Sequence, residues 1–135
     1  RISDDFLIIA RLESLIVKKG INDALKRAEE YSKAGADLIL IHSKEKKPTE
    51  VFKFAKLFRK SKFYKPLVAV PSTYSTVKEK DLIKHGFKLV IYANHMLRSS
   101  YLSMQLTAQK ILKNQRSKET EKNMISINEI IELIE

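Results

Sequence analysis

The sequence predicts an α/β fold made of four strand–helix units, the content of half a (β/α)₈ TIM barrel. Four short apolar runs each end in a polar residue, and a stretch with helical periodicity follows each run. The units recur at roughly 25–30 residues, the size of one strand with its helix. In parallel sheets and barrels ligands bind at the carboxyl ends of the strands, so the polar residues that end the runs indicate the site.

The first two units show this pattern clearly. Residues 6–11 are apolar almost throughout, as expected for a strand buried on both faces. In the helix that follows, Asn22 is expected to cap the amino end and Gly35 to stop the chain in a left-handed conformation. The second strand is expected over residues 38–41, and the helix after it opens near Pro48.

The third and fourth units are shorter but follow the same plan. Pro66 precedes a strand over residues 67–70, at a position where a missing N–H is tolerated. A short helix then closes at Gly86. The fourth strand is expected over residues 89–93, and a long helix with apolar side chains at helical spacing follows over 96–114.

The carboxyl-terminal segment divides into a charged linker and a short helix. Residues 115–123 are highly charged and are expected to form a mobile linker. Ser126 is expected to cap a last amphipathic helix, with Glu129 as its capping-box partner three residues later. The predicted organisation is therefore a half-barrel over residues 1–114, a linker over 115–123 and a helix within 124–135.

Two architectures fit four such units, a complete doubly wound sheet and half of a barrel. A doubly wound domain usually has a glycine-rich turn after its first strand, whereas the turn here reads ARLES. The chain begins with Arg1 and not with methionine, as expected for a processed chain or a piece of a longer product. A full barrel has about 250 residues, close to twice this length. These observations favour the half-barrel.

Composition narrows the function classes. The 135 residues include no cysteine, which excludes a disulfide frame, a thiolate metal site and a cysteine nucleophile, and which fits a cytoplasmic protein. The net charge of +10 suggests a nucleic-acid partner, but the lysines are spread over several elements without interleaved aromatic residues, so none is expected. The apolar runs are well short of the roughly 20 residues that span a bilayer, so no membrane partner is expected.

Arg11 is the strongest candidate for a ligand contact. An arginine that ends a buried strand lies at the rim, where its guanidinium can bind a phosphate or carboxylate through two hydrogen bonds. The structural alternative is a salt bridge to Glu13, which projects to the same side of the extended chain. Both interactions can hold at once.

His42 ends the second strand and is the next candidate. Its imidazole can donate a hydrogen bond to an oxyanion. The structural alternative is a core histidine that is bonded to a backbone carbonyl. Because the first two strands are expected to be neighbours, Arg11 and His42 should lie close together, which favours a shared anion site.

The later strand ends offer weaker candidates. Ser72 and Tyr74 supply hydroxyl donors after the third strand, although a PST turn is also ordinary loop sequence. Asn94 follows the fourth strand and could instead cap the long helix. His85 is expected only to complement the carboxyl end of its helix. No acidic cluster with metal-ligand spacing, Ser/His/Asp order or glycine-rich phosphate loop is visible in the sequence.

Several segments together resemble one enzyme family. ARLES, GINDALKRAEEYSKAGADLILIHSK, VPSTY and YANHMLRSS are similar to the corresponding stretches of the phosphoenolpyruvate mutase and phosphonopyruvate hydrolase branch of the isocitrate lyase superfamily. The resemblance runs from about Asp5 to the last helix. It is far more specific than a single motif because it includes strand-end residues and the helix between them.

The resemblance implies a (β/α)₈ barrel in which this chain supplies strands five to eight. It implies Mg²⁺ as cofactor, bound by acidic residues on earlier strands outside this sequence. The family's arginine and histidine that grip the phosphonate fall on Arg11 and His42, the expected catalytic pair, with Ser72, Tyr74 and Asn94 as further substrate contacts. The implied reaction interconverts phosphoenolpyruvate and phosphonopyruvate, an isomerisation that makes the carbon–phosphorus bond in phosphonate biosynthesis.

The resemblance leaves two alternative activities open. Phosphonopyruvate hydrolysis ranks second, because the lid loop that separates it from the mutase lies outside this sequence, and a related carbon–carbon lyase ranks third. Family members form dimers or tetramers that exchange the last barrel helix, so a homodimer or homotetramer is expected. Since metal ligands and lid are absent from the sequence, we expect the chain alone to be inactive.

Overall fold

The computed structural model describes residue 3 and residues 5–134, which form two compact units that divide between Ala93 and Asn94. The first unit carries the four strands and three of the helices, whereas the second carries the long helix and the carboxyl-terminal segment. The long helix, which the sequence analysis grouped with the half-barrel, thus belongs to the second unit.

The first unit is built on one parallel sheet. Its strands are β1 (Ile9–Leu12), β2 (Leu38–Ile41), β3 (Leu67–Ala69) and β4 (Phe87–Val90), in the spatial order β1-β2-β3-β4. All three neighbouring pairs are parallel. A doubly wound sheet needs a point at which the strand order reverses, and this order has none. The sheet is therefore wound in a single direction.

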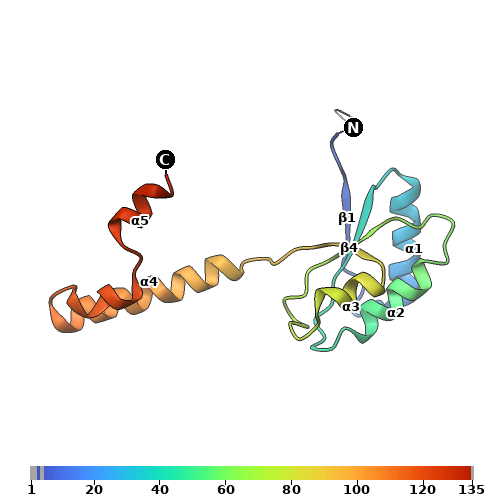
Figure 1. Cartoon of the computed structure of the whole chain (residues 1–135). Helices are drawn as coiled ribbons and strands as arrows, with labels where there is room; N and C mark the ends of the chain where they lie inside the picture. Colours follow the sequence, from blue (N-terminus) through green and yellow to red (C-terminus); the bar gives the residue numbers. More distant parts are fainter. Residues whose placement is uncertain (1–2, 4, 135) are drawn as a thin grey trace. The chain divides into compact units, whose positions relative to one another are not determined.

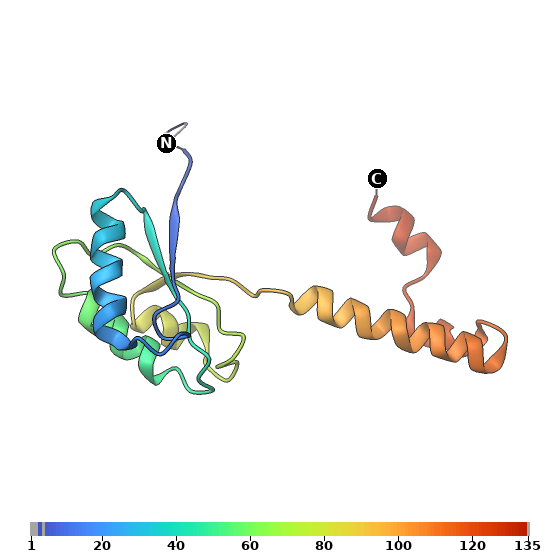
Figure 2. The ribbon, with the colours of Figure 1, turned by 180° about the vertical axis from the view of Figure 1, so that it is seen from behind.

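The helices α1 (Gly20–Lys33), α2 (Thr49–Phe58) and α3 (Glu79–Lys84) cover one face of the sheet, as both ribbon views show (Figures 1 and 2). Right-handed crossovers between successive parallel strands place every helix on the same side. Alternate strand side chains and the inner helix faces form one core cluster there. Its largest fully buried members are Tyr74, Phe54, Phe58, Phe87, Leu12, Ile39, Ile41, Leu67, Leu82 and Val51.

The opposite face of the sheet has a smaller apolar cluster. Leu40, Val68 and Val70 are buried there, and Leu38 and Ile91 pack against them. The two edge strands, β1 and β4, each have one neighbour in the sheet. This face and these edges are the parts of the first unit without a covering helix.

The strands agree with the sequence prediction in place and order, with shifts at their ends. β1 begins at Ile9, not at residue 6, because its ladder with β2 starts at the pair Ile9 and Leu38. β4 covers Phe87–Val90, whereas the prediction was 89–93. The predicted cap by Asn22 is wrong, because α1 already begins at Gly20 and no side chain caps it.

The second unit consists of α4 (His95–Asn114), the 3₁₀ helix η1 (Lys118–Asn123) and α5 (Ile127–Glu132). η1 lies inside the segment that was expected to be a mobile linker, and it contacts α4. Thr120 of η1 is 1% exposed and donates a hydrogen bond of 2.6 Å to the carbonyl of Ser117. The predicted capping box between Ser126 and Glu129 is confirmed. Across the described residues, we find no helix of the length and apolar character that a membrane span requires.

Candidate active site

The candidate site lies at the carboxyl edge of the sheet, on the face that no helix covers. Arg11 pairs with Leu40 in the ladder between β1 and β2, and side chains alternate along a strand, so Arg11, Leu40 and His42 project to the same face. The predicted neighbourhood of Arg11 and His42 is therefore present in the structure.

Arg11 forms the predicted ion pair with Glu13. Its Nε donates to Oε1 of Glu13, and the two side chains are 51% and 44% exposed. An ion pair this exposed contributes little to folding. Its effect is to orient the guanidinium, because Glu13 engages the Nε–H side and directs the two terminal amino groups elsewhere.

The imidazole of His42 has a buried nitrogen, Nδ1, without a hydrogen-bond partner among the described residues. Burial lowers the pKa of His42 below its usual 6.5, the positive charge of Arg11 lowers it further, and Glu13 raises it. His42 is thus mainly neutral at pH 7, with one ring nitrogen able to donate and the other able to accept.

Ser72 and Tyr74 place two more buried hydroxyls beyond the end of β3. Neither the Oγ of Ser72 nor the hydroxyl of Tyr74 has a hydrogen-bond partner of normal geometry among the described residues. Burial raises the pKa of Tyr74 to about 12, an effect that the nearby main chain of Val70 offsets in part. The Tyr74 ring is fully buried in the helix-side core, whereas Arg11 and His42 project to the other face of the sheet.

Asn94 and His85 each lie at the end of a helix. Asn94 begins the second unit, where it precedes α4 in a left-handed conformation with φ of 54° and without a side-chain cap, so the predicted capping alternative is wrong. His85 ends α3, stacks on Phe52 with ring centroids 3.7 Å apart, and has its Nδ1 2.7 Å from the carbonyl of Asp81. The structural role expected for His85 is confirmed.

Two buried serines beside the site were not predicted from the sequence. Ser14 is 2% exposed and donates 2.6 Å to Asp23 in the first turn of α1, and Ser43 is fully buried and donates to Glu50 in the first turn of α2. The signal was a serine shortly after each strand end, followed by an acidic residue in the first turn of the next helix. These serines hold the loops that carry Glu13 and His42.

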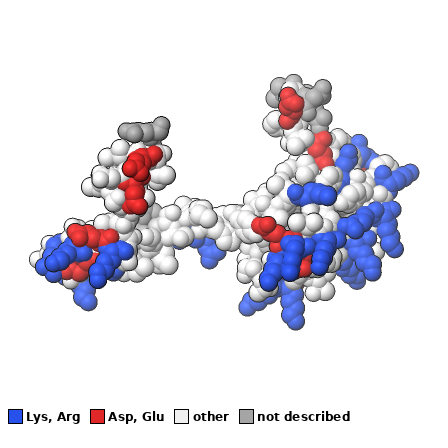
Figure 3. Space-filling model, in the orientation of Figure 1, with Lys and Arg blue, Asp and Glu red and all other residues white. Residues whose placement is uncertain are grey.

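The first unit carries many basic side chains. Lysine and arginine side chains cover much of the first unit in the space-filling view, over the helices that flank the sheet (Figure 3). A shallow cavity of about 250 Å³ beside Arg11 is lined by Leu12, Glu13, Ser14, Val17, Lys19, Asp23, Arg27 and Tyr31. This lining combines acidic and basic side chains.

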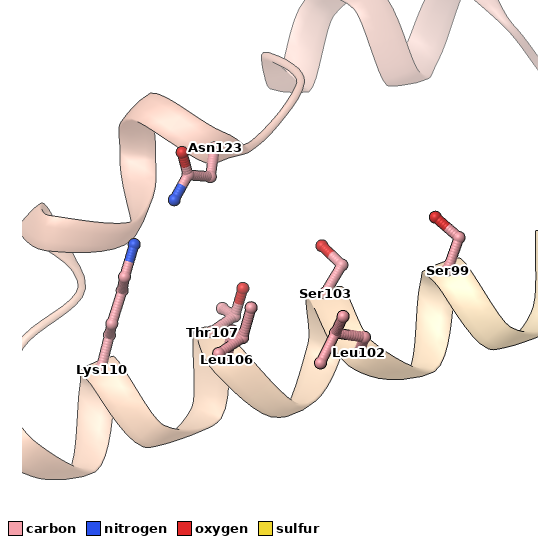
Figure 4. A pocket seen from close by; sticks show the side chains of 7 residues that line it. All are labelled: Ser99, Leu102, Ser103, Leu106, Thr107, Lys110 and Asn123. Atoms are coloured by element: carbon pink, nitrogen blue, oxygen red, sulfur yellow. The ribbon is translucent and has the colours of Figure 1, made fainter.

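The described residues contain no group of three or more His, Cys, Asp or Glu side chains that could hold a metal ion. The second unit has a separate cavity of about 300 Å³, lined by α4 and by Asn123 of η1 (Figure 4). Ser99, Ser103 and Thr107 project into it along one face of α4, and Lys110 is its one charged lining residue. It lies within the second unit and contains none of the predicted site residues.

Comparison with known proteins decides the family. The family model described as "Phosphoenolpyruvate phosphomutase" matches residues 1–112. The chain belongs to the phosphoenolpyruvate phosphomutase family. The family that the sequence motifs indicated is thereby confirmed, within the branch that also includes phosphonopyruvate hydrolase.

Named members of the phosphoenolpyruvate phosphomutase family align with nearly the whole chain. The phosphoenolpyruvate phosphomutase of Tetrahymena pyriformis is 38% identical over 129 residues, which cover 96% of this chain and 42% of that protein. A phosphonopyruvate hydrolase from a Variovorax species is 38% identical over 136 residues, covering 98% of this chain and 45% of that protein. The chain spans less than half the length of these relatives.

Solved structures of this family have the same fold over the matched part. The phosphoenolpyruvate phosphomutase of Streptomyces platensis subsp. rosaceus superposes with a TM-score of 0.89 at 37% identity, covering 97% of this chain and 45% of that one. A phosphonopyruvate hydrolase solved with oxalate and Mg²⁺ also superposes with a TM-score of 0.89, at 36% identity, covering 98% of this chain and 46% of that one.

Proposed function

We propose that this chain supplies the phosphoryl-binding half of a Mg²⁺-dependent phosphoenolpyruvate mutase, an isomerase that interconverts phosphoenolpyruvate and phosphonopyruvate in phosphonate biosynthesis. The observation that carries the proposal is the adjacent pair Arg11 and His42 on one face of the carboxyl edge, in a member of the phosphomutase family. A phosphoryl group is an anion of the kind this pair can bind.

The chemistry requires a group that holds the phosphoryl while it moves. The P–O bond to the enol oxygen breaks, a bond between phosphorus and C3 forms, and the enolate becomes a ketone. Phosphoryl transfer passes through a loose, metaphosphate-like transition state, so positioning and positive charge matter more than a nucleophile. Arg11 supplies the charge through its terminal amino groups, and neutral His42 donates one N–H to a phosphoryl oxygen.

The other polar groups of the edge are proposed as further substrate contacts. Ser72 has a buried hydroxyl without a partner among the described residues, which a carboxylate or phosphoryl oxygen would satisfy. Tyr74 stays protonated because burial raises its pKa to about 12, so its hydroxyl would act as a donor and not as an anion. Asn94 follows β4 in the sequence and is proposed as a contact on the strength of the family motif alone.

We propose the half-barrel as the architecture in which this site works. The single direction of winding and the unpaired outer sides of β1 and β4 fit strands five to eight of a (β/α)₈ barrel. Since the described residues hold no metal cluster, they do not fit a Mg²⁺ site, and the ligands of the ion would come from the other half.

The proposed partner is a second copy of the protein. In α4 no described residue is buried, and a row of large apolar side chains is exposed there, including Met96, Leu97, Tyr101, Leu102, Met104 and Leu112. Exchange of this helix between subunits of a homodimer or homotetramer would cover that row.

Phosphonopyruvate hydrolysis is the second candidate function. The Variovorax hydrolase is as similar to this chain as the Tetrahymena phosphomutase, at 38% identity for both. In the hydrolase reaction water takes the phosphoryl group and pyruvate leaves with a proton at C3. The same Arg11 and His42 would serve either reaction.

Phosphorus NMR separates these functions. The complete reading frame that contains this sequence is expressed, supplied with Mg²⁺ and phosphonopyruvate, and its phosphorus signals are followed. We expect a phosphoenolpyruvate signal to grow as phosphonopyruvate declines. Inorganic phosphate without phosphoenolpyruvate would assign the hydrolase, and an unchanged phosphonopyruvate signal would refute both. The 135-residue chain alone is expected to leave the substrate unchanged, since its described residues hold no metal cluster.

A further inference from the structure

We propose that Ser43, Glu50 and Thr73 form a clamp that positions His42 for the reaction. The proposal deepens the proposed function, because it assigns these residues a role at the same site. None of the three is expected to touch the substrate. They act through the main chain that carries the imidazole, and are therefore positioning residues.

Ser43 is the centre of the clamp. It is fully buried, follows His42 directly and makes three hydrogen bonds. Its hydroxyl donates to Oε1 of Glu50 in the first turn of α2, and accepts from the backbone N–H of Glu45 at 3.0 Å. Its carbonyl accepts from Oγ1 of Thr73 at 2.8 Å. Both the side chain and the main chain of Ser43 are therefore fixed by hydrogen bonds.

Thr73 ties the loop after β3 to the loop after β2. The two residues in this bond are 30 positions apart in sequence, so it fixes the spacing between neighbouring loops and not only a local turn. Thr73 directly follows Ser72, whose hydroxyl is one of the proposed substrate contacts. The bond therefore sets His42 and Ser72 relative to one another.

His42 needs such support because its own ring has little. Its Nδ1 has no hydrogen-bond partner among the described residues, so side-chain bonding does not fix the imidazole from that side. The charged groups that influence it are Arg11 and Glu13, both from the neighbouring loop and strand. The orientation of the His42 imidazole therefore depends on the position of the main chain at His42 and Ser43.

The loop after β1 contains a similar serine–carboxylate hydrogen bond, so this arrangement occurs at both strands that carry the proposed grip. Ser14 is buried, follows Glu13 directly and donates 2.6 Å to Oδ2 of Asp23. That oxygen also accepts from Nε of Arg27 at 2.8 Å. Each side chain of the proposed grip thus lies near a buried serine that is bonded to an acid of the following helix.

The test uses Thr73→Val and Thr73→Ser in the protein from the complete reading frame. Valine keeps the shape of threonine but removes the hydroxyl, whereas serine keeps the hydroxyl. Because Thr73 is exposed, neither change disturbs the core. We expect Thr73→Val to lower kcat roughly 10- to 100-fold, with KM changed less than about threefold, since misplaced catalytic groups cost rate more than binding. Thr73→Ser should restore most of the rate.

A second readout does not depend on activity. The titration of His42 is followed by NMR of the imidazole protons, and its signal is assigned by its loss in His42→Gln. If the clamp holds His42 in its partly buried place, Thr73→Val should raise its pKa toward the usual 6.5, and Thr73→Ser should not. An unchanged titration in Thr73→Val would overturn the proposal.

Ser61→Ala is the matched control. Ser61 donates 2.7 Å to Oε1 of Glu29, a serine–glutamate bond of the same kind, but it lies before β3 on the amino side of the sheet. It should change neither kcat nor the titration of His42. If Ser61→Ala shifts both as much as Thr73→Val, the effect is general loosening and the clamp is refuted. Absent turnover in wild-type protein would refute the proposed function, while the titration would still decide the clamp.

Discussion

Replacement of Arg11 separates the proposed role of this side chain from any contribution to folding. In the structure its Nε–H is taken by Glu13, which leaves the two terminal amino groups for a ligand. Arg11→Ala removes both donors and the charge. Arg11→Lys keeps a charge but presents a single ammonium in place of the planar fork.

The expected magnitudes follow from exposure and bonding. Because the two side chains of the ion pair are 51% and 44% exposed, its loss should cost about 0–1 kcal/mol of folding free energy. Two hydrogen bonds from a guanidinium to a phosphoryl group contribute about 1.5–3 kcal/mol each. Arg11→Ala should therefore lower kcat/KM by roughly 10²–10⁴-fold, and Arg11→Lys by roughly 10- to 100-fold.

The assay measures kcat and KM for phosphonopyruvate together with urea unfolding on the same preparations. Lys33→Ala is the control, because this substitution also removes one positive charge and one exposed ion pair, the pair between Lys33 and Glu30 at 2.7 Å. A change in kcat/KM of less than about threefold for Arg11→Ala, or a loss equal to that of Lys33→Ala, would refute the role assigned to Arg11.

Three further predictions concern pH, a buried hydroxyl and a turn. In the folded protein the pKa of His42 is lowered below 6.5, so as the pH falls the unfolded chain takes up this proton before the folded chain does. The stability that depends on neutral His42 is therefore present above pH 6.5 and is lost as the pH falls toward the folded pKa. His42→Gln should reduce the dependence of the unfolding free energy on pH, measured by urea unfolding between pH 7.5 and 5. Tyr74→Phe removes a buried hydroxyl without a partner among the described residues, so the protein should lose less than about 1 kcal/mol of stability or become more stable. If the hydroxyl binds substrate, the KM of this variant increases; an unchanged KM would remove Tyr74 from the site. Gly86→Ala and Gly35→Ala should each destabilise the protein by about 1–2 kcal/mol, because both glycines have positive φ. A Cβ at Gly86 would also lie 2.4 Å from the end of the flexible Arg59 side chain, which can move away, so the two losses should be similar; a much larger loss at Gly86 in thermal unfolding would contradict this.

Strand positions were predictable because each strand is an uninterrupted apolar run. β2 covers the predicted residues, and β3 differs by one residue at its end. The start of β1 was not predictable, since Phe6 and Leu7 are as apolar as the strand but are 58% and 62% exposed. A run of apolar residues predicts that a segment is buried against another element. The strand itself begins only where a neighbouring strand is present to pair with it.

The Arg11 and His42 pair was predictable for a topological reason. Neighbouring parallel strands end at the same edge, and the polar residue that ends each run therefore meets the other. The bond between Ser43 and Glu50 was missed although both residues lie in one connection, because serine near a turn is ordinary. The bond from Thr73 to the carbonyl of Ser43 joins two loops, so its detection needed the register between β2 and β3, which no local pattern contains.

The proposed barrel would explain both the unpaired sheet edges and the absence of a metal-binding cluster among the described residues. β1 offers an open side and exposes Phe6, Leu7 and Ile8 at its amino end, at 58%, 62% and 41%. A strand laid against that side would pair the edge and cover these residues, and a strand against β4 would close the circle. The carboxyl ends of the added strands would meet the edge that holds Arg11 and His42. Acidic residues placed there would face the proposed phosphoryl site, where a divalent cation could balance the charge of the substrate.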